Sequence, residues 1–219
     1  MIKYKPSPKN NEFYNNKYVN RLVDISLEHL GSPVFNDVLL LITSQNLDKI
    51  KKYFSLFKSK PYYDHDELYR ELQWLFDLIY NDVNCDNLRG VFLELLVFRS
   101  LYKKYGMYSN NSMSLECFVE IGDFKSSRTV DIFALCNYKG LVAECKLSHK
   151  YFEKHDIENL NKIFNYSNKI LSPFIISLAP LRFIQDKLYN IVQEDDTNLW
   201  VHLDAINIIS SENIGSFLS

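Results

Sequence analysis

Three ionisable residues stand inside otherwise apolar stretches of this 219-residue chain. Asp131 lies in TVDIFAL, and Glu144 and Lys146 lie in LVAECKL. In a strand, alternation places Glu144 and Lys146 on one face and Cys145 on the other. If the two segments pair through the intervening turn NYKG, Asp131 lies beside Glu144. Two carboxylates and one ammonium on a covered sheet could form a buried salt bridge. Because desolvation offsets most of the gain from such a pair, a site for chemistry is the better interpretation.

The elements around these residues predict an α/β core. Segments 114–121, 128–136 and 141–147 alternate like strands, and GDFKSS and NYKG supply the turns between them. A helix is expected over 86–104, before the strands. A helix over 153–171, a strand over 173–178, a helix over 181–192 and a strand over 199–203 are expected after them. This order is typical of a mixed sheet flanked by helices.

The N-terminal part has a different pattern. Residues 1–17 are polar and are expected to be extended, and apolar residues then recur at helical spacing. Four helices are predicted, over about 18–30, 34–42, 47–57 and 64–80. We therefore divide the chain into a helical region, residues 1–85, for substrate grip, dimerisation or partner binding, and a catalytic core, residues 86–219.

The spacing of Asp131 and the run Glu144-Cys145-Lys146 resembles the PD-(D/E)XK nuclease superfamily, the restriction-endonuclease-like phosphodiesterases. Many members also carry a glutamate on the preceding helix in a G-x-x-x-E context. Here RGVFLELLVFRSLYKKYG supplies Gly90 and Glu94. The resemblance covers about residues 86–180 and includes the order of elements. One departure is Val130, where the family name has proline.

The resemblance implies roles for these residues. Asp131, Glu144 and the backbone carbonyl of Cys145 would ligate Mg²⁺, for which Mn²⁺ could substitute, since carboxylate and carbonyl oxygens suit hard cations. Lys146 would orient the attacking water or stabilise developing charge, and Glu94 would serve a second metal. Alternatively, Glu94 has no role in the site and simply forms an ion pair with Arg89 or Arg99.

The charge of the chain is compatible with binding nucleic acid at one face. Lys and Arg number 25 against 27 Asp and Glu, which argues against a strongly cationic nucleic-acid coat protein but does not exclude a local basic surface. Residues 86–180 carry 12 basic and 10 acidic groups. Polar and basic residues near the motif are candidate phosphate contacts, although a solvated surface is the simpler reading of each: Lys125, Arg128, Ser148, Lys150, Lys154 and Lys162.

The sequence therefore predicts a metal-dependent nuclease with a restriction-endonuclease-like fold. We expect DNA as substrate, with RNA open, endonuclease rather than exonuclease action, and a context in defence, restriction or mobile elements. A homodimer or a partner protein could use the N-terminal helices. Two alternatives are an inactive binding module of the same fold and a helical regulatory protein. Dispersed cysteines and the lack of a long apolar segment predict a cytoplasmic protein without membrane contact.

Overall fold

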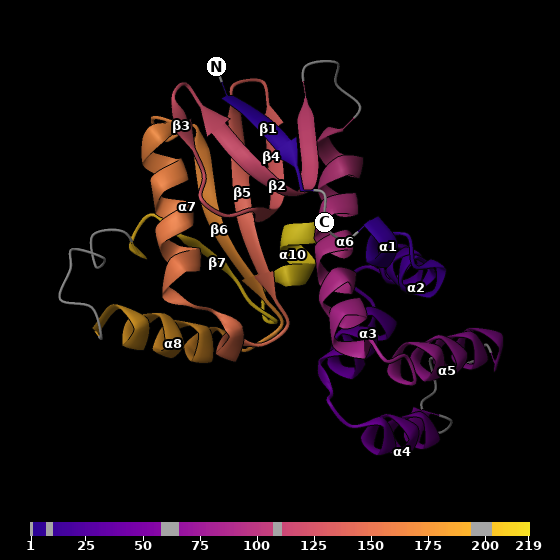
Figure 1. Cartoon of the computed structure of the whole chain (residues 1–219). Coiled ribbons are helices and arrows are strands. Elements are labelled where there is room, and N and C mark those ends of the chain that lie inside the picture. The colour runs from indigo at the N-terminus through magenta and orange to yellow at the C-terminus, as the bar shows by residue number, and fades with distance from the viewer. Residues whose placement is uncertain (1, 8–10, 58–65, 107–110, 194–202) are drawn as a thin grey trace.

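The described residues include a mixed sheet of seven strands with helices packed around it (Figure 1). The computed structural model describes residues 2–7, 11–57, 66–106, 111–193 and 203–219. The strand order is β1-β2-β4-β5-β6-β7, with β3 paired to β2. Pairing is antiparallel from β1 to β5 and parallel from β5 to β7. The strands are β1 (Ile2–Pro6), β2 (Ser112–Ile121), β3 (Phe124–Lys125), β4 (Val130–Cys136), β5 (Lys139–Lys146), β6 (Leu171–Ser177) and β7 (Asn207–Ile209).

Helices cover both faces of this sheet. In Figure 1, α7 and α8 lie on one side, and α6 with the N-terminal helices lies on the other. The N-terminal helices are α1 (Asn11–Tyr14), α2 (Lys17–Glu28), α3 (Pro33–Thr43), α4 (Leu47–Phe57) and α5 (Asp66–Tyr80). The others are α6 (Cys85–Tyr105), α7 (Lys154–Tyr166), α8 (Leu181–Gln193) and α10 (Ile214–Leu218), with a short 3₁₀ turn, η1 (His149–Tyr151).

Local sequence signals explain where several helices begin. Ser32 accepts the backbone N–H of Phe35 at 3.3 Å and is followed by a proline in the first turn of α3. Glu153 and Asp156 form a reciprocal capping box at the start of α7. These caps satisfy backbone donors that have no partner within the helix.

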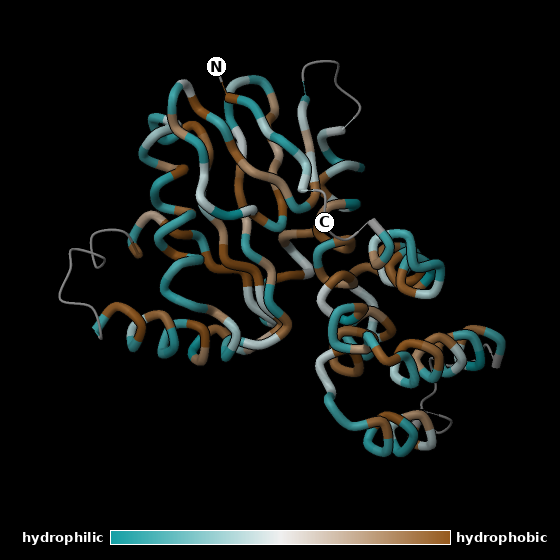
Figure 2. The backbone as a smooth tube through the Cα atoms, viewed as in Figure 1, coloured by the Kyte–Doolittle hydropathy of each residue, from teal (hydrophilic) through white to brown (hydrophobic). Residues whose placement is uncertain are grey.

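The central strands are apolar on both faces, as the sequence predicted for the third strand of the core. Ile132, Ala143 and Ile176 join a hydrophobic cluster with α6 and the N-terminal helices. Their neighbours in sequence, Phe133, Val142 and Ile175, join a second cluster with α7 and α8. Figure 2 shows the helices turning their hydrophobic sides inward and their hydrophilic sides outward. The strands near the site are therefore held by packing from both sides.

The predicted α/β class and the helical N-terminal region are confirmed. Two details differ. Residues 2–6, expected to be an extended arm, form the edge strand β1 on β2. The last strand was predicted at 199–203, where 199–202 lie outside the described residues; the structure places a strand at 207–209 instead. The boundary at residue 85 stays a prediction.

No helix among the described residues is long and apolar enough to cross a membrane. The four cysteines are all described and all free, and Cys117 and Cys145 are buried.

Candidate active site

The β4–β5 hairpin brings Asp131 beside Glu144. Its turn residues Asn137 and Tyr138 have positive φ angles of 45° and 72°. At Gly140, a Cβ would lie 2.2 Å from the carbonyl oxygen of Ala134, so only glycine fits this close approach. The β4–β5 pairs run from Cys136↔Lys139 to Ile132↔Ala143. Asp131 and Glu144 are the next residues on the two strands, so the same register sets them side by side. The predicted juxtaposition therefore follows from the turn.

Lys146 joins the two carboxylates. Its Nζ lies 3.3 Å from Oδ2 of Asp131 and 3.2 Å from Oε2 of Glu144. The backbone N–H of Cys145 donates to the same Oδ2 of Asp131 at 2.7 Å. Glu144 is only 5% exposed. The trio predicted from the sequence thus meets in hydrogen-bonding range on two adjacent strands.

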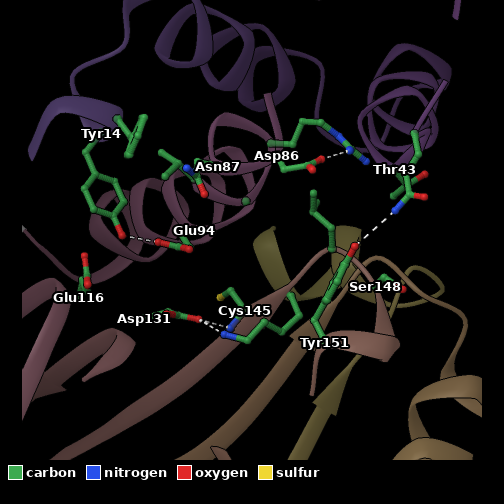
Figure 3. Close-up of a pocket in the computed structure, with 17 residues that line it drawn as sticks. Tyr14, Thr43, Asp86, Asn87, Glu94, Glu116, Asp131, Cys145, Ser148 and Tyr151 are labelled. Atoms are coloured by element: carbon green, nitrogen blue, oxygen red, sulfur yellow. Dashed lines mark hydrogen bonds and ion pairs between the residues drawn. The ribbon is translucent and has the colours of Figure 1, made fainter. Parts of the chain in front are cut away.

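Glu94 enters the site from α6. The hydroxyl of Tyr14, on α1, donates a short hydrogen bond to Oε2 of Glu94 (Figure 3). Glu94 is half-buried. Burial, and then the charge of Asp131, raise the pKa of Glu94 well above its ordinary value. Burial and Glu94 likewise raise the pKa of the Tyr14 phenol. Ion pairs of Glu94 with Arg89 or Arg99, the alternative from the sequence, are absent among the described contacts: Arg89 pairs with Asp86 and Arg99 with Asp24.

Glu116, which the sequence did not single out, is a further carboxylate at this site. It lies on β2 between the pairs Leu115↔Ile132 and Cys117↔Val130, so it stands across from Asp131. Its φ of 37° departs from strand geometry. An acidic residue between Leu115 and Cys117 could have suggested a site residue from the sequence. Its position across from Asp131, however, depends on the register between β2 and β4.

Carboxyl groups outnumber the ammonium at this centre. Burial and the charge of Asp131 raise the pKa of Glu144. Burial alone would lower the pKa of Lys146, but Asp131 and Glu144 outweigh it and raise that pKa above its ordinary value. Lys146 therefore keeps its charge. An enclosed group of acids of this kind favours binding of either protons or cations.

Two pockets meet at the site. One, of about 440 Å³, is bounded by α6, the end of β5 and the N-terminal helices, and the other, of about 600 Å³, opens toward the start of α7. Both are lined by Glu116, Asp131, Lys146 and Tyr151. Figure 3 shows Tyr14, Glu94, Glu116 and Asp131 toward one end of the first pocket and Thr43, Ser148 and Tyr151 toward the other. A ligand could therefore extend to either side of the carboxylates.

The predicted phosphate contacts separate into two groups. Ser148 lines the first pocket, and Arg128 lines the second, where its Nη1 is 2.6 Å from Nε2 of His155. Lys150 lines a smaller hollow near α8. The rest are surface residues: Lys125 pairs with Glu120 at 3.9 Å, Lys154 pairs with Glu158 at 3.7 Å, and Lys162 is exposed on α7.

The donors at the site suit a hard cation in kind, because Asp131, Glu144, Glu94 and Glu116 all supply carboxylate oxygens. Within the described ranges, no three His, Cys, Asp or Glu side chains are grouped as ligands of one ion. Lys146 and the Cys145 N–H both engage Oδ2 of Asp131. A cation at Asp131 would therefore use the other carboxylate oxygen or displace the ammonium.

Comparison with known proteins gives likeness in structure alone. No protein-family model matches the sequence, and no curated protein is similar to it. Protein VC1899 from Vibrio cholerae superposes with a TM-score of 0.51 at 14% identity, over 99% of this chain and 57% of its own. Can2 from Sulfobacillus thermosulfidooxidans, solved in complex with cyclic tetra-adenylate, gives 0.48 at 13% identity, over 99% of this chain and 53% of its own. This chain spans less than two thirds of either protein. The likeness to VC1899 shows a shared α/β fold.

Proposed function

We propose that this protein is a metal-dependent nuclease that hydrolyses phosphodiester bonds. The observation that carries the proposal is the meeting of Asp131, Glu144 and Lys146 within 3.3 Å contacts at the junction of two pockets. The resemblance of this trio to the PD-(D/E)XK nucleases adds support, as does Glu94 on the preceding helix. DNA is the proposed substrate on that resemblance, and RNA stays open.

The residues divide the work of hydrolysis. Asp131 and Glu144, with Glu94 and the Cys145 carbonyl, would hold Mg²⁺ or Mn²⁺. A bound divalent ion supplies a more acidic water and offsets charge on the phosphate. Lys146 is positioned by both carboxylates, so its ammonium can hold the attacking water or a phosphate oxygen. Arg128, at the rim of the second pocket, can bind a neighbouring phosphate.

The test is a cleavage assay with the purified chain. Linear, circular and single-stranded DNA, and then RNA, are incubated with Mg²⁺ or Mn²⁺. We expect Asp131→Asn to lower the rate at least about 100-fold, the range typical of losing a group that acts directly in catalysis. The matched control is Asp82→Asn, at an exposed position in the turn before α6, which should keep full activity. Absence of cleavage by wild-type protein on every substrate with either metal would refute the proposal. Equal activity of the two variants would show that Asp131 has no catalytic role.

A further inference from the structure

Gly90 occupies an unusual position, the sixth residue of the 21-residue helix α6. A glycine inside a helix is less favourable than alanine, so it usually has a local reason. Its φ is not positive, and in the described part of the chain, apart from its two neighbours and the backbone of its own helix, no heavy atom lies within 4 Å of a Cβ built on it. Neither backbone conformation nor packing against the protein therefore requires glycine at this position.

The open space over Gly90 belongs to the first pocket, which it lines. Asn87 and Glu94 line the same pocket and lie three residues before and four residues after Gly90. This spacing puts all three on one face of α6. The helix therefore forms a floor to the pocket, with bare backbone at its centre, an amide at one end and the Glu94 carboxylate at the other (Figure 3).

The walls above this floor carry groups that suit a planar, hydrogen-bonding ring. Two aromatic residues, Tyr14 and Tyr151, line the pocket, and so do residues with amide and hydroxyl groups: Asn87, Gln45 and Thr43. Nε2 of Gln45 donates to the Tyr151 hydroxyl at 3.4 Å and thereby bridges from the end of α3 to η1. Aromatic side chains stack on bases, and amides read base edges. The volume of about 440 Å³ is in the range of small-ligand sites.

We propose that this pocket is a nucleoside subsite, in which the backbone at Gly90 contacts the sugar or base next to the phosphate at Lys146. The proposal rests on the proposed nuclease function and adds to it the part of the substrate that the pocket receives. Gly90 is then a substrate-contact residue, since any side chain there would occupy the space of the nucleoside. A nucleotide enters this subsite only when it is unpaired or turned out of its duplex.

The experiment compares two helical glycines. Gly90→Ala places a methyl group in the pocket, and Gly215→Ala places one on α10, at an ordinary contact distance of 3.8 Å from Phe35. Both variants should melt at or above the wild-type temperature, because both gain helix propensity without a clash. We expect kcat/KM of Gly90→Ala to fall about 10- to 100-fold, since small misplacement of a substrate has effects of that size. Gly215→Ala should match wild type.

A Gly90→Ala enzyme as active as wild type would overturn the subsite and leave the nuclease function standing. If that variant melts below wild type, Asn87→Ala replaces it, because Asn87 is exposed at the other end of the same floor; an unchanged kcat/KM in Asn87→Ala would then refute the subsite.

A wild-type protein without nuclease activity would refute the proposed function. The subsite would then be tested separately, by measuring nucleotide binding. Thymidine 5′-monophosphate and adenosine 5′-monophosphate are titrated into the ¹⁵N-labelled chain. The amide signals of Asn87 and Gly90 should shift in wild type, with at least about 10-fold weaker binding in Gly90→Ala. Absence of shifts with both nucleotides would overturn the inference.

Discussion

Replacing Glu94 by glutamine should make the protein more stable at neutral pH. The Glu94 carboxylate is enclosed near Asp131, and its pKa is raised well above 4.5 by burial and by that neighbouring charge. Glutamine has nearly the same shape, and its side-chain oxygen can still accept the hydrogen bond from Tyr14. The substitution therefore removes the ionisable group from the site and keeps the packing of α6.

The size of the effect follows from the protons bound. Above pH 4.5 the unfolded chain releases the Glu94 proton, whereas the folded protein retains it until the pH passes the raised pKa. Wild type therefore loses about 1.4 kcal/mol of unfolding free energy per pH unit from this group over that window. At pH 7 the upper limit is about 3.4 kcal/mol. Because Glu94 is only half-buried, we expect about 1–3 kcal/mol, equivalent to roughly 2–12 °C in melting temperature.

The sign of the pH dependence is a stringent check. The contribution of Glu94 to the free energy of unfolding is greatest below pH 4.5. It is lost as the pH rises from there through the pKa that Glu94 has in the folded protein. The difference between Glu94→Gln and wild type should therefore be near zero at pH 4 and grow toward pH 8. Urea unfolding in the presence of a chelator, at several pH values, measures this difference.

Glu71 offers a control with the opposite sign. Its bond to Arg21 lowers its pKa, so Glu71→Gln should be slightly destabilising above pH 4.5 and neutral in more acidic solution. Because this pair is partly exposed, the effect should stay below about 1 kcal/mol. A Glu94→Gln protein that is no more stable than wild type at pH 8 would show that the Glu94 carboxylate is not destabilising, which would refute the reasoning.

Two further predictions concern the same centre. Lys146→Met should destabilise the protein by about 3–5 kcal/mol at pH 8 in urea unfolding, because Asp131 and Glu144 lose their shared cation. The loss should be smaller near pH 5, because the raised pKa of Glu144 lets this carboxyl group take up a proton. Equal losses of stability at both pH values would contradict this prediction. Mg²⁺ at 100 times its Kd should raise the unfolding free energy by about 2.7 kcal/mol in calorimetric melts. A similar gain in the Asp131→Asn, Glu144→Gln double variant would place the ion elsewhere.

Elements with strong local signals could be predicted from the sequence. The helix expected over 47–57 has those bounds in the structure. The hairpin around NYKG also forms with the register that sets Asp131 beside Glu144. In both cases apolar spacing and turn residues act over a few neighbouring positions, so the information is contained in one short window.

Features that depend on distant segments could not be predicted in this way. The strand Ile2–Pro6 is short and half polar, and its partner β2 lies more than a hundred residues further along the chain. Tyr14 reaches Glu94 across 80 positions. The proximity of Glu116 to Asp131 required the register of β2 on β4, which no local pattern encodes.

The edge strand β1 has a consequence for how this protein can be dissected. Since β1 pairs with β2 while α1 to α6 come between them in the chain, the N-terminal helices are an insertion into the sheet domain rather than a module placed before it. A truncation that starts the chain at α6 would remove the outer strand β1, the Tyr14 partner of Glu94 and the helices α1 to α5 together. Its phenotype could not be assigned to any one of these three losses. A deletion that isolates the role of the helices must be internal, with β1 retained and joined to α6 by a designed linker.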